Sequence, residues 1–263
     1  MGAHLEHCRE TSSCSLHRYG CRRWGAMLSP GDVCAIVPAY NEEKSIVSVV
    51  AELRLALPAA EVIVVSDGST DQTAELALGA GAVVVSLPVN LGIGGAVQAG
   101  YRYALRSGFR IAVQVDGDGQ HDPGELSRIL DPIMSNEVDL VIGSRWLGRG
   151  DYVGSRARRI GMRVLTVLVR WRTGLWFTDT TSGFRAAGPR ALAAFARSYP
   201  ADYPEVEAIV IGARMGLRMM EVPVRMNARK YGRSTIGGWR SLYYMARVAM
   251  ALVVGGASGA IGS

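Results

Sequence analysis

The sequence predicts an α/β fold in which a mostly parallel central sheet is flanked by helices. Apolar segments of strand length alternate with longer segments whose apolar residues recur at helical spacing, and this alternation is typical of parallel sheets. The strand segments are nearly all apolar, which indicates that helices cover both faces of the sheet. Polar clusters follow several strands, at the edge where such sheets bind ligands.

The first half of the chain supplies four predicted strands, which cover residues 33–40, 62–65, 82–88 and 110–116. The helix after the first strand carries an apolar stripe, and Asn41 is its predicted N-cap. The second strand is followed by a turn at residues 67–69 and a helix entered near Asp71. The third leads through the stretch NLGIGGAVQAG into a helix, and the fourth ends in an acidic loop.

Basic residues dominate the region after the sequence EVDLVIGSRW. The net charge of +6 and the pI near 9.3 favour anionic partners such as phosphates, nucleic acid or a membrane surface. On a helix, one flank would carry Arg156, Arg159, Arg163 and Arg170, and the next flank Ile160, Val164, Leu168 and Trp171. Such a helix suits a membrane surface, although a core helix with a solvated basic side fits the same pattern.

The chain divides into a leader at residues 1–27, a domain at 28–238 and a tail at 239–263. The leader contains Cys8, Cys14 and Cys21 among three histidines, in spacings that match no standard zinc motif. It also lacks the apolar core of a signal peptide, so we expect a disordered extension or a true start at Met27. The tail is amphipathic and apolar but short for a spanning helix, and we expect it to associate with a membrane.

The acidic loop QVDGDGQHDP places Asp116 and Asp118 on either side of one glycine, directly after a buried strand. Two carboxylates this close repel each other and lose hydration, unless a cation lies between them. Asp122 before Pro123 has a simpler explanation, since it can cap the helix that follows. Asp116 and Asp118, together with Gln120, therefore form a candidate metal site.

Two common nucleotide-binding motifs are absent. The glycines of NLGIGGAVQAG, which include Gly94, could hold phosphate, but they do not form G-x-G-x-x-G and they follow the third strand. The turn GSTDQT lacks the lysine of a P-loop. A dinucleotide-binding enzyme and a P-loop kinase are both disfavoured.

Seven blocks, in order and spacing, resemble the family 2 glycosyltransferases of GT-A fold. They are VPAYNEE, VVSDGSTDQT, NLGIGGAVQAG, VDGDGQHDP, VIGSRW, DTTSGFRA and ARKYGRST, and they cover about residues 32–240. The branch they resemble contains dolichol-phosphate mannosyltransferases and other polyprenyl-phosphate glycosyltransferases. The resemblance implies the nucleotide-diphospho-sugar transferase fold and an inverting enzyme that moves a hexose from a UDP- or GDP-sugar to a polyprenyl phosphate.

The resemblance also implies roles for individual residues. Mg2+ or Mn2+ would be held by Asp116, Asp118 and Gln120. The donor would contact Pro38, Tyr40, Glu42, Val65, Asp67, Gly94, Asp116, Gly117, Asp118, Gln120, Arg145, Arg229 and Ser234. The acceptor phosphate would contact Arg145, Arg159, Arg163 and Ser182, and the catalytic residues would be Asp118, Asp179 and Arg229. Ser66 and Thr235 depart from the family pattern, where an aspartate and a lysine are usual, so the base and the sugar stay open.

The expected partners are a nucleotide sugar, a polyprenyl phosphate, the membrane surface and a separate membrane-anchoring protein. The expected location is cytoplasmic, peripheral on the inner face of the cell membrane. A phosphate acceptor is largely dianionic at neutral pH, so Asp179 would orient it rather than deprotonate it. A saccharide or soluble alcohol acceptor would instead need Asp179 as a base, and Glu205 and Glu207 are expected near the same site.

A non-catalytic nucleotide- or nucleic-acid-binding protein is the alternative of another class. The aromatic residues do not interleave with arginines as they do in single-strand binders, so we expect no nucleic-acid partner.

Overall fold

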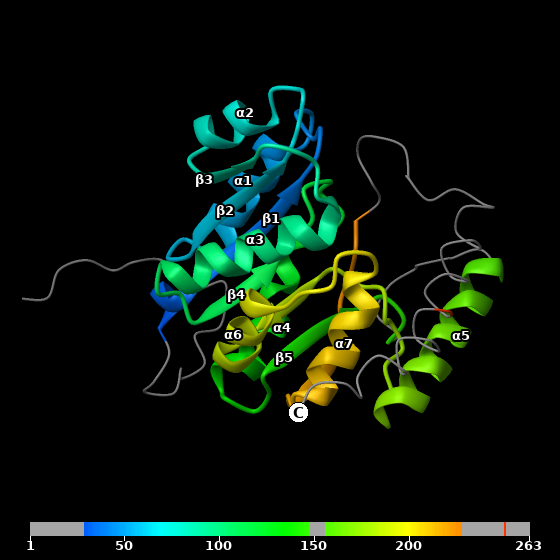
Figure 1. The fold of residues 1–263 in the computed structure, drawn as a ribbon. Helices are drawn as coiled ribbons and strands as arrows, with labels where there is room; N and C mark the ends of the chain where they lie inside the picture. Colours follow the sequence, from blue (N-terminus) through cyan, green and yellow to red (C-terminus); the bar gives the residue numbers. More distant parts are fainter. Residues whose placement is uncertain (1–28, 148–155, 228–249, 251–263) are drawn as a thin grey trace, which may run out of the picture.

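The computed structural model describes residues 29–147, 156–227 and Met250, and for Pro30 and residues 156–159 it describes the backbone alone (Figure 1). The predicted leader lies outside these residues, as does the predicted tail apart from Met250. The proposed donor residues Arg229 and Ser234 lie outside them too.

A seven-stranded sheet in the order β3-β2-β1-β4-β6-β5-β7 forms the centre of the domain. Its strands are β1 (Val33–Ala39), β2 (Glu61–Asp67), β3 (Val83–Leu87), β4 (Ile111–Gln114), β5 (Leu140–Ser144), β6 (Arg185–Ala187) and β7 (Met219–Pro223). All neighbouring strands pair in parallel except β6, which is antiparallel to both β4 and β5. The predicted mostly parallel α/β sheet is confirmed.

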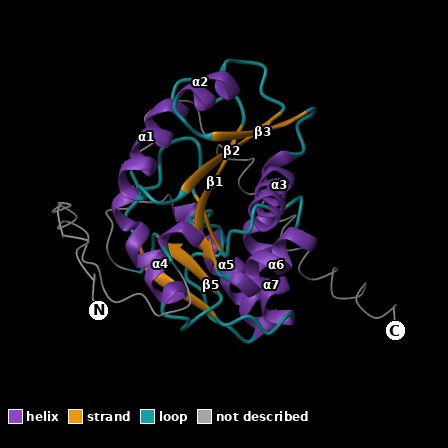
Figure 2. Ribbon diagram, turned by 90° about the vertical axis from the view of Figure 1, so that its left-hand side faces the viewer, coloured by secondary structure: helices purple, strands orange, loops and turns teal. Residues whose placement is uncertain are grey.

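Helices cover both faces of the sheet, as Figure 2 shows. The helices are α1 (Ile46–Ala56), α2 (Thr73–Gly79), α3 (Gly92–Arg106), α4 (Leu126–Met134), α5 (Arg156–Thr173), α6 (Pro189–Arg197) and α7 (Pro204–Arg214), with short 3-10 helices at Pro30–Asp32 and Pro123–Glu125. One face packs against α1, α2 and α4, and the other against α3, α6 and α7. Helix α5 packs against α7 at the side of the domain.

The core owes its stability to strands that are apolar on both sides. Every residue of β1 is buried, and alternate residues contribute to the two cores, with Cys34 and Ile36 on one side and Val33 and Ala35 on the other. Each fully buried valine or isoleucine side chain contributes about 1.5–3 kcal/mol relative to an exposed one. This two-sided core fixes the strand ends that carry the polar loops.

Two local features differ from the sequence prediction. Helix α1 begins at Ile46, and Asn41 is not its N-cap; Asn41 has a left-handed backbone (φ 55°), which asparagine tolerates better than most residues. Strands β5, β6 and β7 were not predicted. The β6 strand matters for the site, because it starts at the edge where the parallel strands end and so brings the preceding loop, residues 178–184, to that edge.

Among the described helices, none is both long enough and apolar enough to cross a bilayer.

Candidate active site

The loops after β1 and β2 are joined by side-chain hydrogen bonds. The Thr70 N–H donates to Asn41 Oδ1 at 2.9 Å, and the Glu42 N–H donates to Thr73 Oγ1 at 2.8 Å. The Glu43 N–H donates to Asp71 Oδ2 at 3.2 Å. The two loops therefore form one fixed rim at the carboxyl end of the sheet.

The residues expected to contact the donor base and ribose lie at different depths in this rim. Tyr40 is 49% exposed and available to a ligand, and Glu42 is half-buried with its Oε2 accepting from Ser45 Oγ. Asp67 is buried, and its Oδ1 accepts from the Leu91 N–H at 2.7 Å, so it ties the loop after β2 to the start of α3. Val65 is completely buried in the core, and the donor contact expected of its side chain is not compatible with that position.

Gly94 and Pro38, which were both expected to contact the donor, are buried in the structure. Gly94 is buried, and an added Cβ would lie 2.1 Å from the Pro200 carbonyl oxygen, so this glycine serves close packing of α3 against the 200–201 backbone rather than a phosphate cradle. Pro38 is buried at the end of β1. Its carbonyl oxygen would lie 3.1 Å from a Cβ on Gly117, which explains why the acidic loop carries glycine there.

The acidic loop is held by His121. The Asp116 N–H donates to His121 Nδ1 at 3.0 Å, which leaves the ring proton on Nε2, 3.5 Å from Asp116 Oδ2. The ring stacks on Phe184, with centroids 4.6 Å apart. Burial lowers the pKa of His121, against the raising effects of Asp116 and Asp118, so the imidazole is neutral and acts as a fixed support.

The two carboxylates of the loop sit in different surroundings. Asp118 is buried, and its Oδ1 accepts from the Gln120 N–H at 3.0 Å. The half-buried Asp116 carboxylate lies against Gln114 Nε2 at 3.5 Å and against Gly183, where an added Cβ would be 3.1 Å from both of its oxygens. Gly183 is therefore needed for the close approach of the 178–184 loop to Asp116.

The acidic loop is also tied to the last described segment of the domain. The Asn227 N–H donates to the Gln120 carbonyl at 2.7 Å, and His121 forms an isolated antiparallel bridge with Met226. Asn227, which is two residues before Arg229 in the sequence, thus lies beside the acidic loop.

The residues present fit a divalent cation that is shared with a phosphate ligand. Among the described residues there is no group of three or more histidine, cysteine, aspartate or glutamate side chains that could hold a metal alone. Mg2+ is usually bound by one or two carboxylates together with substrate phosphates, and the donor set of Asp116, Asp118 and Gln120 matches that chemistry. Carboxylate and amide oxygens also suit Mn2+.

Arg145 and Asp179 form a buried, bidentate ion pair. Arg145 Nε donates to Asp179 Oδ2 at 2.6 Å and Nη2 donates to Oδ1 at 2.7 Å, while the Arg145 N–H also reaches Oδ2 at 3.1 Å. Asp179 has no exposed surface. Glu221 on β7 fixes the segment from the other side, since its carboxylate accepts from the N–H groups of Thr178 and Asp179. Both oxygens of the Asp179 carboxylate therefore bind Arg145, and Asp179 holds the Arg145 guanidinium in position.

A second buried arginine lies on the same side of the sheet as α7. Arg185 is directly opposite Gln114 in the β4–β6 register, and its Nε donates to the Ser182 carbonyl at 2.7 Å. Burial raises the pKa of Glu205, at the start of α7, against the lowering effects of Arg185 and Arg145. Burial also raises the pKa of Glu207, together with the charge of Asp202. That Glu205 and Glu207 contribute to the site stays a prediction.

The residues expected to bind the acceptor phosphate are not all accessible. Arg163 is exposed on α5, and Arg159 lies on the same helix with its side chain outside the described atoms. Ser182 has no exposed surface, and its hydroxyl oxygen accepts from the Phe184 N–H within its own turn. The structure therefore does not expose Ser182 to a ligand, and the acceptor contact expected of it stays a prediction.

Sequence reasoning gave no role to His121 or Glu221, and placed Arg185 only in a segment expected to border the acceptor. The position of His121 in the acidic loop could have indicated its role, because a histidine this close to two aspartates can hold them in place. Arg185 lies within the DTTSGFRA block, which places it beside Asp179 and Ser182 in the sequence. Glu221 had no signal, since it reaches the site only through the β5–β7 pairing.

Comparison with known proteins agrees with this geometry. The family model for glycosyl transferase family 2 matches residues 34–195, more than half of the chain. The chain is 34% identical to the undecaprenyl-phosphate mannosyltransferase of Micrococcus luteus, over 78% of this chain and 88% of that protein. It is 30% identical to the polyprenol monophosphomannose synthase of Mycolicibacterium smegmatis, over 77% and 80%.

A solved structure shows the same architecture. The glucosyl-3-phosphoglycerate synthase of Mycobacterium tuberculosis, crystallised with Mn2+, uridine diphosphate and glucosyl-3-phosphoglycerate, superimposes with a TM-score of 0.61. It is 26% identical, and the alignment covers 85% of this chain and 78% of that one.

Proposed function

The chain belongs to glycosyl transferase family 2 and is a glycosyltransferase, and from that premise we propose that it moves a hexose from a UDP- or GDP-sugar to a polyprenyl phosphate, with inversion. The observation that carries the proposal is the acidic loop, fixed at the sheet edge by His121 and tied to Asn227. The two relatives named for undecaprenyl phosphate and polyprenol support the acceptor class.

On the donor side, the chain would bind the nucleotide along the rim formed by the loops after β1 and β2. Tyr40 offers an exposed ring for the base, and Glu42 offers carboxylate oxygens to the ribose or base. Asp67 keeps the rim in shape through Leu91. Ser66 is buried and uncharged, which leaves the choice between uracil and guanine open.

Asp116, Asp118 and Gln120 would hold Mg2+ or Mn2+ together with the donor diphosphate. When bound, the cation would supply Lewis-acid neutralisation of the departing charge. The Mn2+ and uridine diphosphate in the related synthase support this assignment. His121 and Gly183 keep Asp116 in place, and Arg229, which lies outside the described residues, is proposed as a further ligand of the leaving diphosphate.

On the acceptor side, the phosphate oxygen would attack the anomeric carbon as the bond from that carbon to the diphosphate breaks. The acceptor is already largely dianionic at neutral pH and has no proton that must be removed. Asp179 would therefore act through Arg145, whose planar guanidinium it holds in one orientation. Arg163 and Arg159 would compensate the acceptor charge from α5.

The outer side of α5 would rest on the membrane. Ile160 is 64% exposed and Trp171 is 67% exposed, and Val164 is exposed between them. These residues form an apolar stripe beside exposed arginines, a combination suited to the headgroup region of a bilayer. We therefore propose peripheral association with the inner face of the cell membrane; a separate membrane-anchoring partner is a further proposal, and no nucleic-acid partner is required.

A soluble phosphorylated acceptor is the second candidate, because the related synthase was crystallised with glucosyl-3-phosphoglycerate. A soluble acceptor would not explain the exposed apolar stripe of α5, because it offers that stripe no apolar surface to contact. The alternative of another class, a non-catalytic nucleotide-binding protein, predicts that Asp118→Ala leaves nucleotide binding unchanged and that binding does not depend on a metal.

The test is a panel of radiolabelled UDP- and GDP-sugars, each incubated with Mn2+ and either a polyprenyl phosphate in detergent or 3-phosphoglycerate. Label that enters the organic phase from one donor, and is lost with Asp118→Asn, supports the proposal. Label confined to the aqueous product would establish the soluble acceptor instead. No transfer to either acceptor would contradict both.

A further inference from the structure

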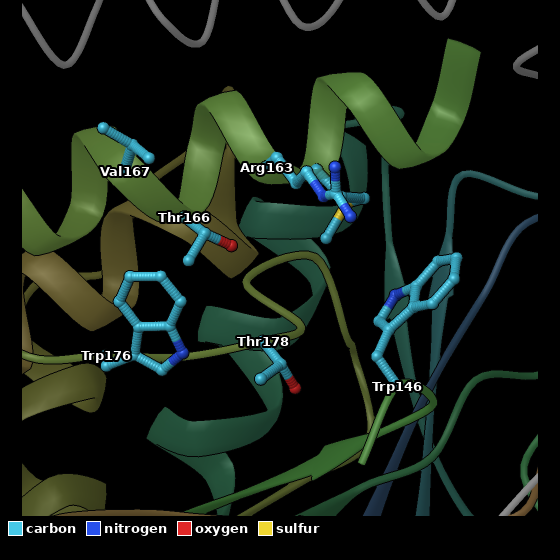
Figure 3. A pocket seen from close by; sticks show the side chains of 7 residues that line it. Trp146, Arg163, Thr166, Val167, Trp176 and Thr178 are labelled. Atoms are coloured by element: carbon cyan, nitrogen blue, oxygen red, sulfur yellow. The ribbon is translucent and has the colours of Figure 1, made fainter. Parts of the chain in front are cut away.

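An apolar pocket of about 510 Å3 lies beneath α5, beside the Arg145–Asp179 pair. Its described lining residues are Trp146, Met162, Arg163, Thr166, Val167, Trp176 and Thr178. In Figure 3, α5 forms the roof, and Trp176 and Trp146 stand on opposite sides of Thr178. A volume of this size is within the range of pockets that bind small organic ligands.

The pocket shares its inner wall with the candidate active site. Trp146 follows Arg145 in the chain, and Thr178 precedes Asp179. Thr181 connects the two regions directly, because its hydroxyl accepts from Arg145 Nη2 at 3.0 Å and contacts Met162 Sδ at 3.5 Å. A molecule in the pocket would therefore have one end within reach of the guanidinium that Asp179 orients.

The outer part of the pocket reaches the apolar surface of α5. Val167 is 58% exposed and Trp176 is 57% exposed, although both line the pocket. The Arg170 guanidinium lies 5.1 Å from the centre of the Trp176 ring, a cation–π contact that holds the indole in place. The pocket thus extends from the charged site to the surface that we assign to the membrane.

We propose that this pocket binds the first isoprene units of the acceptor lipid, with its phosphate at Arg163 and Arg145. The proposal rests on the function proposed above and adds a lipid subsite to it. Charge complementarity favours this occupant: of the described lining residues Arg163 alone is charged, and the others offer mainly apolar surface. A phosphorylated hydrocarbon matches both parts, whereas a phosphorylated sugar or glycerate would leave the tryptophan-lined part unfilled.

The experiment compares geranyl phosphate with methyl phosphate in the full-length protein. Binding is measured by calorimetry, and sugar transfer is measured with the preferred donor. Thr166→Phe fills the buried side of the pocket, and Trp176→Ala removes an exposed wall at little risk to folding. Val47→Phe is the matched control, since it adds the same ring to an exposed site on α1, on the other face of the sheet.

Wild type and Val47→Phe are expected to bind geranyl phosphate at least ~10-fold more tightly than methyl phosphate, a preference that a few apolar groups in a pocket can supply. Thr166→Phe and Trp176→Ala are expected to lose most of that preference and to raise the KM for geranyl phosphate, with the donor KM unchanged. Equal preference in all four proteins would overturn the pocket assignment while transfer by wild type still upheld the enzyme. If wild type transferred no sugar, the enzyme proposal would fail, and calorimetry would still decide the pocket.

Discussion

Arg145→Met would break the buried pair that positions the acceptor side of the site. Arg145 gives Asp179 two side-chain hydrogen bonds, at 2.6 Å from Nε and 2.7 Å from Nη2, and the carboxylate is fully buried. Methionine keeps much of the volume and the backbone N–H, but leaves a buried charge without its counterion.

The expected cost follows from those contacts. A hydrogen bond to a charged group contributes about 1.5–3 kcal/mol, so the loss of two gives about 3–6 kcal/mol. Removal of one partner from a buried ion pair typically costs about 3–5 kcal/mol, which agrees. Because domains of this kind unfold with about 5–15 kcal/mol, the variant should lose a large fraction of its stability.

Urea unfolding followed by circular dichroism measures the change, with the m-value checked for two-state behaviour. Arg190→Met is the matched control: Arg190 Nη1 lies 2.8 Å from Asp139 Oδ2, but the arginine side chain is 57% exposed, and Arg218 remains to pair with Asp139. The control should lose about 1 kcal/mol or less. A loss in Arg145→Met no larger than that in Arg190→Met would refute the reasoning.

Three further perturbations follow. Gly183→Ala should displace the Asp116 carboxylate and raise the Mn2+ concentration needed for half-maximal transfer by ~10-fold. Gly79→Ala is the control, because its Cβ would lie in open space. It should raise the free energy of unfolding by about 0.5–1 kcal/mol and leave the Mn2+ requirement unchanged. Burial raises the pKa of Asp139, but hydrogen bonds and charge from Arg218 and Arg190 outweigh it and lower that pKa below 3.8. Asp139→Asn should therefore destabilise the protein by about 1–3 kcal/mol at neutral pH. The difference in unfolding free energy between wild type and variant should shrink as the pH falls below 3.8, since the stability that an acid of lowered pKa provides is lost there. A pH-independent difference in urea unfolding would count against this explanation. Val164→Glu on the exposed stripe of α5 should reduce sedimentation with anionic vesicles several-fold, and undiminished sedimentation would show that α5 is not the membrane-facing element.

Much of the sheet could be predicted because its strands can be recognised in the sequence as runs of apolar residues. The run of apolar residues in β1, β2 and β4 has no other stable arrangement than burial on both faces, and the polar residues after each strand must then meet at one edge. Tyr40, Asp67 and Asp116 were placed correctly at that edge for this reason.

The depth of each side chain could not be predicted in the same way. Val65 and Ser182 are one or two residues from Asp67 and Gly183, yet each is completely buried. Val65 lies in a strand that is covered on both faces, and Ser182 lies in a tight turn in which its hydroxyl accepts from the Phe184 N–H. The apolar residues of α5 show the same limit. The sequence left open whether the flank with Ile160 and Val164 faces a membrane or the core; in the structure both are exposed, and Leu165 and Val169 enter the core.

The central claim is that Asp118 binds a divalent cation together with a nucleoside diphosphate, and calorimetry of UDP and GDP binding with and without Mn2+ tests it most directly. Asp122→Asn is the matched control, because Asp122 only caps the following turn through the Gly124 N–H, and asparagine caps equally well. Mn2+ should tighten binding of the preferred nucleotide by at least ~10-fold in wild type and Asp122→Asn, and should have little effect in Asp118→Asn. An equal effect of Mn2+ in Asp118→Asn would contradict the account.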